Sequence, residues 1–378
     1  METTLRALFI GEGALGPGVM GHARAQGVLR HQLATQDVDA RFASLPAAGP
    51  FARAAMRGVP YLEATDLDLH TVRWHLAQGV RARRVIDREL ARGGPFDVLH
   101  VHSHTISFLS HAHMRRIPTL LSLDATVWQW HEMGIWRDVR PYSKAVVAPS
   151  LALEKRALES ASAVLAFSNW CRRDVERRAS RARVIDHHPG IDLDAYRPVP
   201  KRPRQRSRVL FVGGRFEEKG GPELLDALGP LIGTRLDLDV VTPARVEERP
   251  GLRVHRLSPG APALAELFQQ ADIFCLPTRG DAVPFAVLEA MACGAAVVAT
   301  DVGGIPDLLD GGDAGRLVKV GDGPALHEAV TGLIDDPALR ETLAGRARAR
   351  CEQRFDAARQ TARLIDLMRE VAAAGPPA

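Results

Sequence analysis

The stretch RPVPKRPRQRS, residues 197–207, divides the chain into two halves that carry the same kind of pattern. It holds three prolines and a run of basic residues, a composition that interrupts helices and strands and is typical of a domain boundary. On both sides of it, short apolar runs alternate with amphipathic helical patterns. This alternation favours parallel sheets with helices on both faces. The sequence therefore predicts an α/β protein with two Rossmann-like domains of similar size.

The expected elements follow from this alternation along each half of the chain. In the first half, strands are expected at 5–11, 39–45, 96–103, 118–124, 163–168 and 183–192, with helices near 19–35, 70–92, 151–161 and 169–179. In the second half, strands are expected at 208–214, 236–242, 252–257, 273–277 and 295–300, with helices at 221–229, 262–271 and 284–293 and a helical tail over 324–373. Open parallel sheets bind ligands beyond the carboxyl ends of their strands, so the cleft between the two domains is the expected site.

The composition excludes several classes of protein. The 378 residues carry a formal net charge of only +4, which is too small to indicate nucleic-acid binding. The basic run 201–208 is interpreted as a solvated linker, with weak attraction to anionic lipid or an anionic substrate as the alternative. Four cysteines without metal-ligand spacing fit a reducing cytosol, and no signal peptide or membrane span is evident. We expect a cytoplasmic protein, with peripheral contact at the inner membrane face as a further option.

The segment GEGALG, residues 11–16, matches a dinucleotide fingerprint after a strand. A dehydrogenase would bind NAD through Gly11, Gly13 and Gly16. However, Pro17 and Gly18 follow the third glycine, and the nearby aspartates precede the second strand, whereas the fingerprint's ribose-binding acid stands at that strand's far end. The segment is alternatively a plain turn, or a glycine loop that lets a substrate or diphosphate approach the backbone closely.

A second glycine-rich turn, VGGRFEEKGG at 212–221, directly follows the first strand of the second half. Arg215 and Lys219 are four residues apart, so both side chains can point at one anion. Two cations beside a diphosphate would stabilise the charge that develops as it leaves. The alternative is a solvated turn in which Glu217 and Glu218 are the partners of the two cations.

Two further patterns could indicate metals. The histidines of HVHSHT, residues 100–105, would share one face of an extended strand, either as a zinc site or as ordinary core residues, with His104 the one expected to reach the cleft. Three D-x-D pairs occur at 66/68, 192/194 and 237/239, where they resemble background in a chain with 45 acidic residues more than metal ligands. We predict no metal site.

The segment GDAVPFAVLEAMACG, residues 280–294, places two acids around a helix start. Pro284 suits a first helical turn, so Asp281 lies in the loop before the helix and Glu289 about one and a half turns into it. The free N–H groups of the helix start, at Pro284, Phe285 and Ala286, offer an anion site between the acids. This layout fits a sugar nucleotide. The alternatives are a glycosidase carboxylate pair, which leaves Arg215 and Lys219 without a role, and an acidic helix cap with one surface glutamate.

Taken together, VGGRFEEKGGPELLDAL (212–228) and GDAVPFAVLEAMACGAAVVATDVGGIPDLL (280–309) resemble the retaining glycosyltransferases of family 4, which have the GT-B fold. FDVLHVHSHT and HHPGIDLDAYRP resemble the family in the expected order. The resemblance implies that Arg215 and Lys219 hold the donor diphosphate, that Glu289 holds the ribose, and that Asp281 contacts the donor sugar. It also implies further donor contacts at Gly18, Gly214, the helix start at 284–286, and the backbone near Leu257.

Two positions depart from the family pattern. Asp281 stands where glutamate is usual, and Asp124 follows the strand PTLLSL where a histidine usually touches the donor sugar. The loop VWQWHEMGIW (127–136) is rich in tryptophan, and we expect Trp128 and His131, together with His104, to contact the acceptor. Ordinary packing is the alternative for this loop.

The resemblance implies an acceptor-binding domain over 1–200, a nucleotide-sugar domain over 207–355, and a terminal helix at 356–373 that packs back on the first domain. The expected reaction is retaining, metal-independent hexosyl transfer to an unknown glycan, lipid or small molecule, with no cofactor. A sugar-nucleotide epimerase of the same fold and an NAD-dependent oxidoreductase remain the alternatives.

Overall fold

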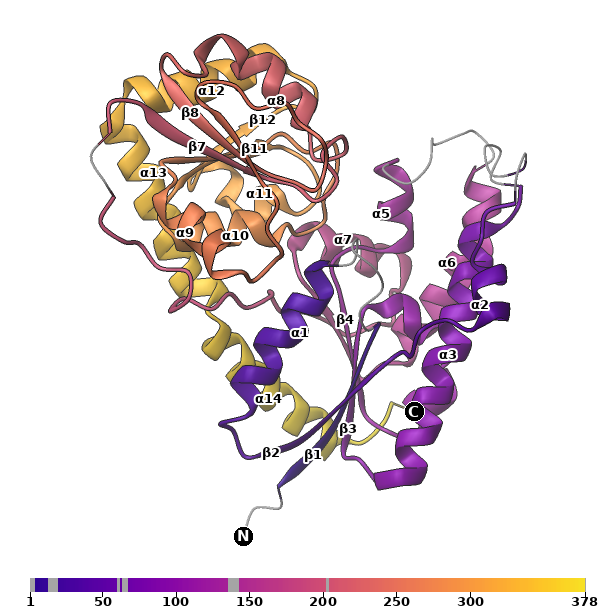
Figure 1. Ribbon diagram of the computed structural model, residues 1–378. Coiled ribbons are helices and arrows are strands. Elements are labelled where there is room, and N and C mark those ends of the chain that lie inside the picture. Colours follow the sequence, from indigo (N-terminus) through magenta and orange to yellow (C-terminus); the bar gives the residue numbers. More distant parts are fainter. Residues whose placement is uncertain are drawn as a thin grey trace. The chain divides into compact units, whose positions relative to one another are not determined.

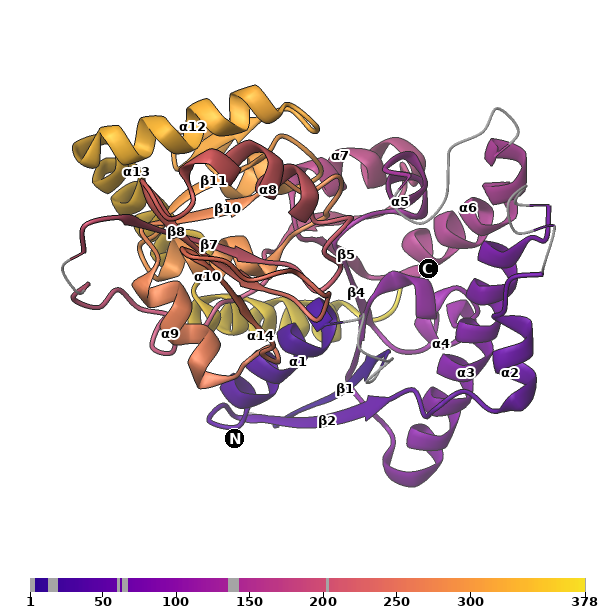
Figure 2. The same cartoon turned by 45° about the horizontal axis from the view of Figure 1, so that its top comes forward.

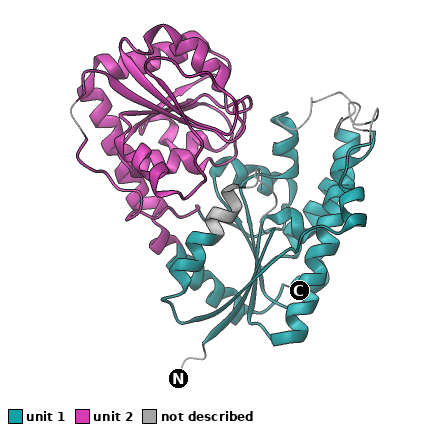
Figure 3. Ribbon diagram, in the orientation of Figure 1, with its two compact units in different colours: residues 1–188, 361–378 teal, residues 189–360 magenta. Residues whose placement is uncertain are grey.

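The computed structural model describes residues 4–12, 20–59, 62, 67–134, 143–201 and 204–377. The chain forms two compact units, one of residues 1–188 with 361–378 and one of residues 189–360 (Figure 3). The unit boundary lies ahead of the proline-rich stretch because the residues leading into it pack on the second unit. There, Ile191 pairs with Asp356, and Lys201 donates to the carbonyl of Ala271 at 2.7 Å.

Unit 1 contains a six-stranded parallel sheet in the order β2-β1-β3-β4-β5-β6. Its strands are β1 (Leu5–Gly11), β2 (Val38–Ser44), β3 (Val98–His102), β4 (Thr119–Leu123), β5 (Ala163–Ala166) and β6 (Val184–Asp186). Its helices are α1 (Met20–Leu33), α2 (Pro50–Ala55), α3 (His70–Gly93), α4 (His111–Met114), α5 (Val127–Glu132), α6 (Ser143–Ser160) and α7 (Asn169–Arg178), with a 3₁₀ turn η2 (His104–Ser107).

The alternating side chains of the unit 1 strands build two separate cores. Leu8 and Ile10 point to the face covered by α3, α6 and α7, whereas Ala7 and Phe9 point to the opposite face. That second face is covered by α1 and by the chain's last helix, α14 (Ala357–Ala374), as Figures 1 and 2 show. Period-two alternation in each strand thus explains why the sheet has helices on both sides.

Unit 2 contains a second six-stranded parallel sheet, in the order β12-β11-β10-β7-β8-β9. Its strands are β7 (Ser207–Val212), β8 (Leu236–Val241), β9 (Leu252–His255), β10 (Ile273–Leu276), β11 (Ala296–Thr300) and β12 (Arg316–Val318). Its helices are α8 (Gly221–Leu228), α9 (Pro262–Gln270), α10 (Phe285–Ala292), α11 (Ile305–Leu308), α12 (Gly323–Asp335) and α13 (Pro337–Arg350), with short turns η3 (Gly229–Leu231), η4 (Asp310–Gly312) and η5 (Cys351–Phe355). Helix α8 packs against α12, and α10 lies beside α9 and α13 (Figure 1).

The prediction of two parallel-sheet Rossmann-like units is confirmed, and the differences are local. Sequence reasoning missed β12 and α11, which have only three and four residues. It expected a loop over 127–136, but 127–132 forms α5, because Thr126 and Gln129 make a capping box at its start. Within the described chain, no helix has the length and apolarity needed to cross a membrane.

Candidate active site

The switch point of the unit 2 sheet lies between β7 and β10. These strands are neighbours, but the chain proceeds from β7 to β8 on one side and from β10 to β11 on the other. Ligands of open α/β sheets bind at this point, outside the carboxyl ends of the strands. The two loops that follow these ends, 213–220 and 277–284, contain five of the predicted donor-site residues: Gly214, Arg215, Lys219, Asp281 and Pro284.

The loop after β7 folds as one helical turn. The N–H of Lys219 donates to the carbonyl of Arg215 at 2.9 Å, which brings the two cationic side chains near one another. A Cβ on Gly213 would lie 2.9 Å from the Cβ of Lys219, so glycine lets the lysine stem fold over the strand end. Gly214 has open space where a Cβ would stand, which leaves its backbone accessible to a ligand.

Two glycines hold the loop 277–284 between its neighbours. Gly220 has φ +78°, and a Cβ there would lie 1.9 Å from the carbonyl oxygen of Pro277. Gly303 has φ +61°, and a Cβ there would lie 1.8 Å from the carbonyl oxygen of Asp281. Only glycine satisfies both the positive φ and the close approach. Sequence reasoning gave neither glycine a role, although the pairs at 220–221 and 303–304 were visible in the quoted motifs.

Lys219 and Asp281 form an ion pair across the two loops. Their side chains are 24% and 13% exposed, so the pair is partly shielded and yet open to a ligand. Arg215 lies 3.6 Å from Glu218 through its Nη1 and is 32% exposed. The structure therefore brings together the predicted diphosphate cation and the predicted sugar carboxylate. Their predicted roles toward the donor stay predictions.

Helix α10 begins one residue later than expected. Pro284 is its N-cap with ψ 115°, and the helix starts at Phe285. Phe285 and Ala286, in the first turn, are partly exposed, whereas the rest of the helix is buried. Glu289 is 1% exposed on its fifth position, the only charged side chain in the helix. Its predicted role with the ribose stays a prediction.

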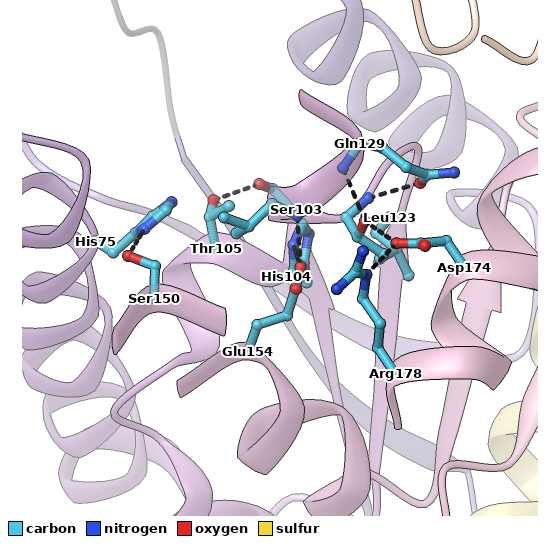
Figure 4. Close-up of polar contacts among 12 residues, drawn as sticks. His75, Ser103, His104, Thr105, Leu123, Gln129, Ser150, Glu154, Asp174 and Arg178 are labelled. Atoms are coloured by element: carbon cyan, nitrogen blue, oxygen red, sulfur yellow. Dashed lines mark hydrogen bonds and ion pairs between the residues drawn. The ribbon is translucent and has the colours of Figure 1, made fainter. Parts of the chain in front are cut away.

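In unit 1, Asp124 follows the last residue of β4 directly and precedes the capped start of α5. Thr126 accepts from the N–H of Gln129 at 3.1 Å, and Gln129 Oε1 accepts from the N–H of Thr126 at 3.0 Å. Thr126 also donates to the buried carboxylate of Asp174, which binds Arg178 at 2.8 Å (Figure 4). This network fixes the turn that carries Asp124.

The buried thiol of Cys171 lies in the same region, with its Sγ 3.8 Å from the carbonyl of Leu123 at the end of β4. Burial raises the pKa of this thiol well above its usual value, and the charges of Asp124, Glu154 and Asp174 raise it further. Cys171 therefore remains protonated.

His104 has a different place from the one predicted. Its ring is 2% exposed, and its Nε2 lies 2.7 Å from Oε1 of Glu154 (Figure 4). The same Glu154 oxygen accepts from the N–H of Val127 at 2.7 Å. His104 thus ties the end of β3 to the start of α5, and its ring does not reach solvent. Its predicted contact with the acceptor stays a prediction.

The zinc alternative for the three histidines also fails on geometry. Ser103 has φ 77°, which ends β3 and turns His104 away from the face shared by His100 and His102. His100 bonds to Ser122 at 2.6 Å instead, and burial, with a contribution from His187, lowers the pKa of His100 to about 3. The described residues contain no group of three His, Cys, Asp or Glu side chains that could hold a metal ion.

Trp128 is also less available than predicted. It is 8% exposed, and its ring centroid lies 4.8 Å from Arg178 and 5.3 Å from Lys144. These two cation–π contacts pack the ring within unit 1, and its contact with an acceptor stays a prediction. His131 lies 5.5 Å from the Trp128 ring and is partly exposed, which leaves it as the accessible member of the predicted acceptor set.

A carboxylate that sequence reasoning missed lies at the switch point of the unit 1 sheet, between β1 and β3. Glu12 follows β1 and is 8% exposed. It accepts hydrogen bonds from Ser103 Oγ at 2.7 Å and Thr105 Oγ1 at 3.0 Å, both in the segment after β3. The sequence did offer one signal for Glu12, because this acid directly follows a predicted strand. Gly18, with Gly13 and Gly16, lies outside the described residues.

Comparison with known proteins agrees with this geometry. The family model described as Glycosyltransferase Family 4 matches residues 21–195, and the model described as Glycosyl transferases group 1 matches residues 206–336. The alpha-maltose-1-phosphate synthase of Mycobacterium tuberculosis is 30% identical over 281 residues, which cover 62% of this chain and 71% of the relative. The chain belongs to glycosyltransferase family 4.

Other relatives extend this comparison over more of the chain. The phosphatidyl-myo-inositol mannosyltransferase of Mycolicibacterium smegmatis is 28% identical over 316 residues, 79% of this chain and 77% of that protein. Among solved structures, sucrose-phosphate synthase from Thermosynechococcus elongatus has a TM-score of 0.76 at 18% identity and covers 98% of this chain and 100% of that one. The Anabaena protein HepE, in complex with UDP-glucose, has a TM-score of 0.67 at 17% identity and covers 97% of this chain and 100% of that one. The fold is thus that of the GT-B glycosyltransferases, and the protein is a glycosyltransferase of the family 4 type.

Proposed function

We propose that this glycosyltransferase transfers a hexose from a nucleoside-diphosphate sugar to an acceptor, with retention of anomeric configuration and without a metal ion. The observation that carries the proposal is the Lys219–Asp281 ion pair at the switch point of the unit 2 sheet. Similar proteins support the donor class, since the HepE structure contains UDP-glucose and the curated relatives include a mannosyltransferase.

In this proposal, each group has a task. Arg215 and Lys219 offset the negative charge that accumulates on the diphosphate as the bond to the sugar breaks. The first N–H groups of α10 add a fixed partial positive charge to the same anion. Asp281, which holds Lys219 in the absence of a ligand, accepts hydrogen bonds from sugar hydroxyls when the diphosphate takes over the lysine.

The retention proposal rests on a front-face mechanism, because the carboxylates beside the cations already have partners: Asp281 pairs with Lys219 and Glu218 with Arg215. In the described loops 213–220 and 277–284, Asp281 is the only carboxylate that touches Lys219. A mechanism in which the acceptor attacks from the face that the diphosphate leaves needs no protein nucleophile, and the diphosphate itself can take the acceptor's proton. Proton NMR of the product, recorded before anomeric equilibration, tests this. An inverted anomeric centre would refute retention.

The first test is a thermal-shift screen with UDP, GDP, ADP and TDP and their sugars, followed by transfer assays with the stabilising donor. Lys219→Ala should lower turnover about 10²- to 10³-fold, the cost of removing one charge-stabilising donor. Lys319→Ala, an exposed lysine of the same unit, is the matched control. Near-wild-type turnover of a folded Lys219→Ala protein would refute the assignment.

Two further arms separate the alternatives. EDTA should leave turnover unchanged, whereas loss of activity that Mg²⁺ restores would contradict metal independence. An arm without acceptor tests the epimerase alternative, because an epimerase converts the nucleotide sugar on its own. Conversion of the donor to its epimer in that arm would overturn glycosyl transfer as the main activity.

We also infer peripheral contact between unit 1 and an anionic membrane surface. In the described chain, seven of the eight exposed large apolar side chains fall within residues 51–80: Phe51, Val59, Leu62, Leu67, Leu69, Leu76 and Val80. Arg83 and Arg84 continue the exposed face of α3. Apolar side chains flanked by arginine favour the interface of an anionic bilayer.

The membrane inference is tested by flotation with phosphatidylglycerol vesicles, with phosphatidylcholine vesicles as the control. Leu76→Ser with Val80→Ser should reduce the bound fraction. Equal flotation of wild type and this variant would remove α3 from the proposed contact.

A further inference from the structure

Unit 2 contains a pocket of about 450 Å³ that Leu257, a predicted donor contact, lines but that the donor-site residues Arg215, Lys219 and Asp281 do not line. It lies beside α9, over β7 and β9, and is lined by Arg204, Arg208, Arg253, His255, Leu257, Ala263, Glu266, Leu267 and Gln270. Arg208 is the second residue of β7, whereas the donor loop follows the sixth. Five residues of extended chain span about 16 Å, so the pocket's cations are well separated from the donor cations along this strand.

A buried carboxylate organises these cations. Asp239, in the middle of β8, is 0% exposed and accepts from Nε of Arg208 and from Nε2 of His255, the latter at 2.7 Å. The Nε of Arg253 lies 3.5 Å from the same carboxylate. Burial by itself would raise the pKa of Asp239, but the hydrogen bonds from Arg208 and His255 outweigh it and lower this pKa. Asp239 therefore stays ionised and orients both guanidinium groups.

The two arginines retain their terminal N–H groups for another partner. Arg208 and Arg253 both use Nε toward Asp239, and within the described chain their Nη atoms make no hydrogen bond. The side chain of Arg208 is only 18% exposed, while that of Arg253 is 57% exposed. Two guanidinium forks with fixed orientation and free terminal donors match the geometry of a phosphate oxyanion.

We propose that this pocket binds a phosphate group, carried by a small metabolite or present as the free ion, between Arg208 and Arg253. The volume lies within the range of small-molecule sites and exceeds what a bare phosphate needs. Glu266 and Gln270 of α9 line the same pocket and offer acceptors and donors for hydroxyl groups.

The proposal also gives a role to the basic run 201–208. Lys201, Arg204 and Arg206 are exposed, as the solvated interpretation expects, but the described cations of this run also bond back onto unit 2. Lys201 donates to the carbonyl of Ala271, Arg204 to that of Gln270 at 2.8 Å, and Arg206 to Asp237 at 3.1 Å. Arg204 and Arg208 then supply two of the three arginines that line the pocket. The run thus concentrates positive charge at one place on unit 2.

Isothermal titration of the full chain with glucose 1-phosphate, and separately with inorganic phosphate, tests the proposal at ionic strength held constant with sodium chloride. Arg253→Gln should weaken binding about tenfold, the loss expected for charge-assisted hydrogen bonds. Arg253→Lys, which keeps the charge and loses the fork, should also weaken it. Arg235→Gln is the control, since Arg235 is an exposed arginine of the same unit that pairs with one carboxylate. Tighter binding of glucose 1-phosphate than of phosphate identifies a metabolite as the occupant, and equal binding identifies the free ion.

A second arm separates this pocket from the donor site. The double variant Arg215→Ala/Lys219→Ala should bind the probe as the wild type does, whether or not the chain transfers a sugar. Binding that survives Arg253→Gln, or that disappears in the double variant, would overturn the proposal. A thermal melt of each variant shows that it is folded, so a loss of binding reports on the pocket.

Discussion

Replacing Gly220 by alanine should separate the two donor loops. Gly220 has φ +78°, and its Cβ would lie 1.9 Å from the carbonyl oxygen of Pro277. Ordinary contact begins at 3.4 Å, so the loops must move apart by about 1.5 Å. Gly321 is a matched control, because it has the same φ of +78° and open space around a Cβ.

Both substitutions carry the free-energy cost of a left-handed alanine, but only Gly220→Ala adds a steric clash. A left-handed alanine costs about 1–2 kcal/mol at either position. Gly220→Ala adds the overpacking cost of about 1–3 kcal/mol, so it should destabilise unit 2 by roughly 3 kcal/mol. A shift of about 1 Å in the Lys219–Asp281 pair should also lower kcat/KM for the donor about 10²-fold. Gly321→Ala should leave kcat/KM unchanged.

The assay must report on unit 2. All five tryptophans precede Pro189, so tryptophan fluorescence follows unit 1. Hydrogen exchange of the backbone amides of α8 and α10 reports the opening of unit 2 directly. Equal exchange and equal kcat/KM in Gly220→Ala and Gly321→Ala would refute the argument that the loops are held together at this glycine.

Three other predictions follow from the site and from buried groups. Asp281→Asn should lower kcat/KM about 10²-fold, while Asp281→Glu, which keeps the charge, should retain most activity; donor kinetics with equal values for both would contradict a role for the carboxylate's charge. Burial raises the pKa of Cys293 and Cys351 to about 12, so iodoacetamide at pH 8 should modify them only in urea, as mass spectrometry can show. Burial lowers the pKa of His75 and of His100 to about 3. The unfolded chain binds protons below about pH 6.5, where folded unit 1 does not. Its stability should therefore be fully present above pH 6.5 and fall by up to ~1.4 kcal/mol per pH unit per histidine as the pH drops toward 3. Urea unfolding at pH 7 and 5 should show a smaller difference in a His75→Gln/His100→Gln variant.

The fold could be predicted because its signals are local. Apolar runs such as 208–214 and 273–277 mark buried parallel strands, and Pro284 marks a helix start. The short strand β12 gave no such signal, because three residues are too few to show a pattern. The helix α5 was missed because the tryptophan-rich segment was interpreted as a contact loop. The capping box of Thr126 and Gln129, which starts the helix, was overlooked.

The donor side of the site was predictable in its residues and not in its contacts. The spacing of Arg215 and Lys219 predicted that both lie on one turn. Nothing in the sequence around them predicts that Lys219 pairs with Asp281, which is 62 positions away. The acceptor side was less predictable, because burial depends on packing partners from distant elements. Glu154 draws His104 inward, and Arg178 covers Trp128.

The partners of the basic run 201–208 could not be predicted from the sequence either. Charge alone made residues 201–208 look solvated, since nothing nearby in sequence offers partners. Their acceptors come from β8 and from the end of α9, brought close only by the folded sheet. A run of charged residues can therefore belong either to a free linker or to the surface of a folded unit. The partners of its side chains decide between the two.

Unit 1 is formed by two segments of the chain, 1–188 and 361–378, and this affects how the protein folds during synthesis. Leu364, Ile365, Met368 and Val371 of α14 complete the core on the face of Ala7 and Phe9, yet all of unit 2 lies between them in the sequence. During synthesis, that apolar face of the first sheet stays uncovered until the residues of α14 leave the ribosome, while unit 2 can already fold. A nascent chain that stops near residue 360 would thus display a folded second unit and an unfinished first one, the form of the protein that chaperones would hold.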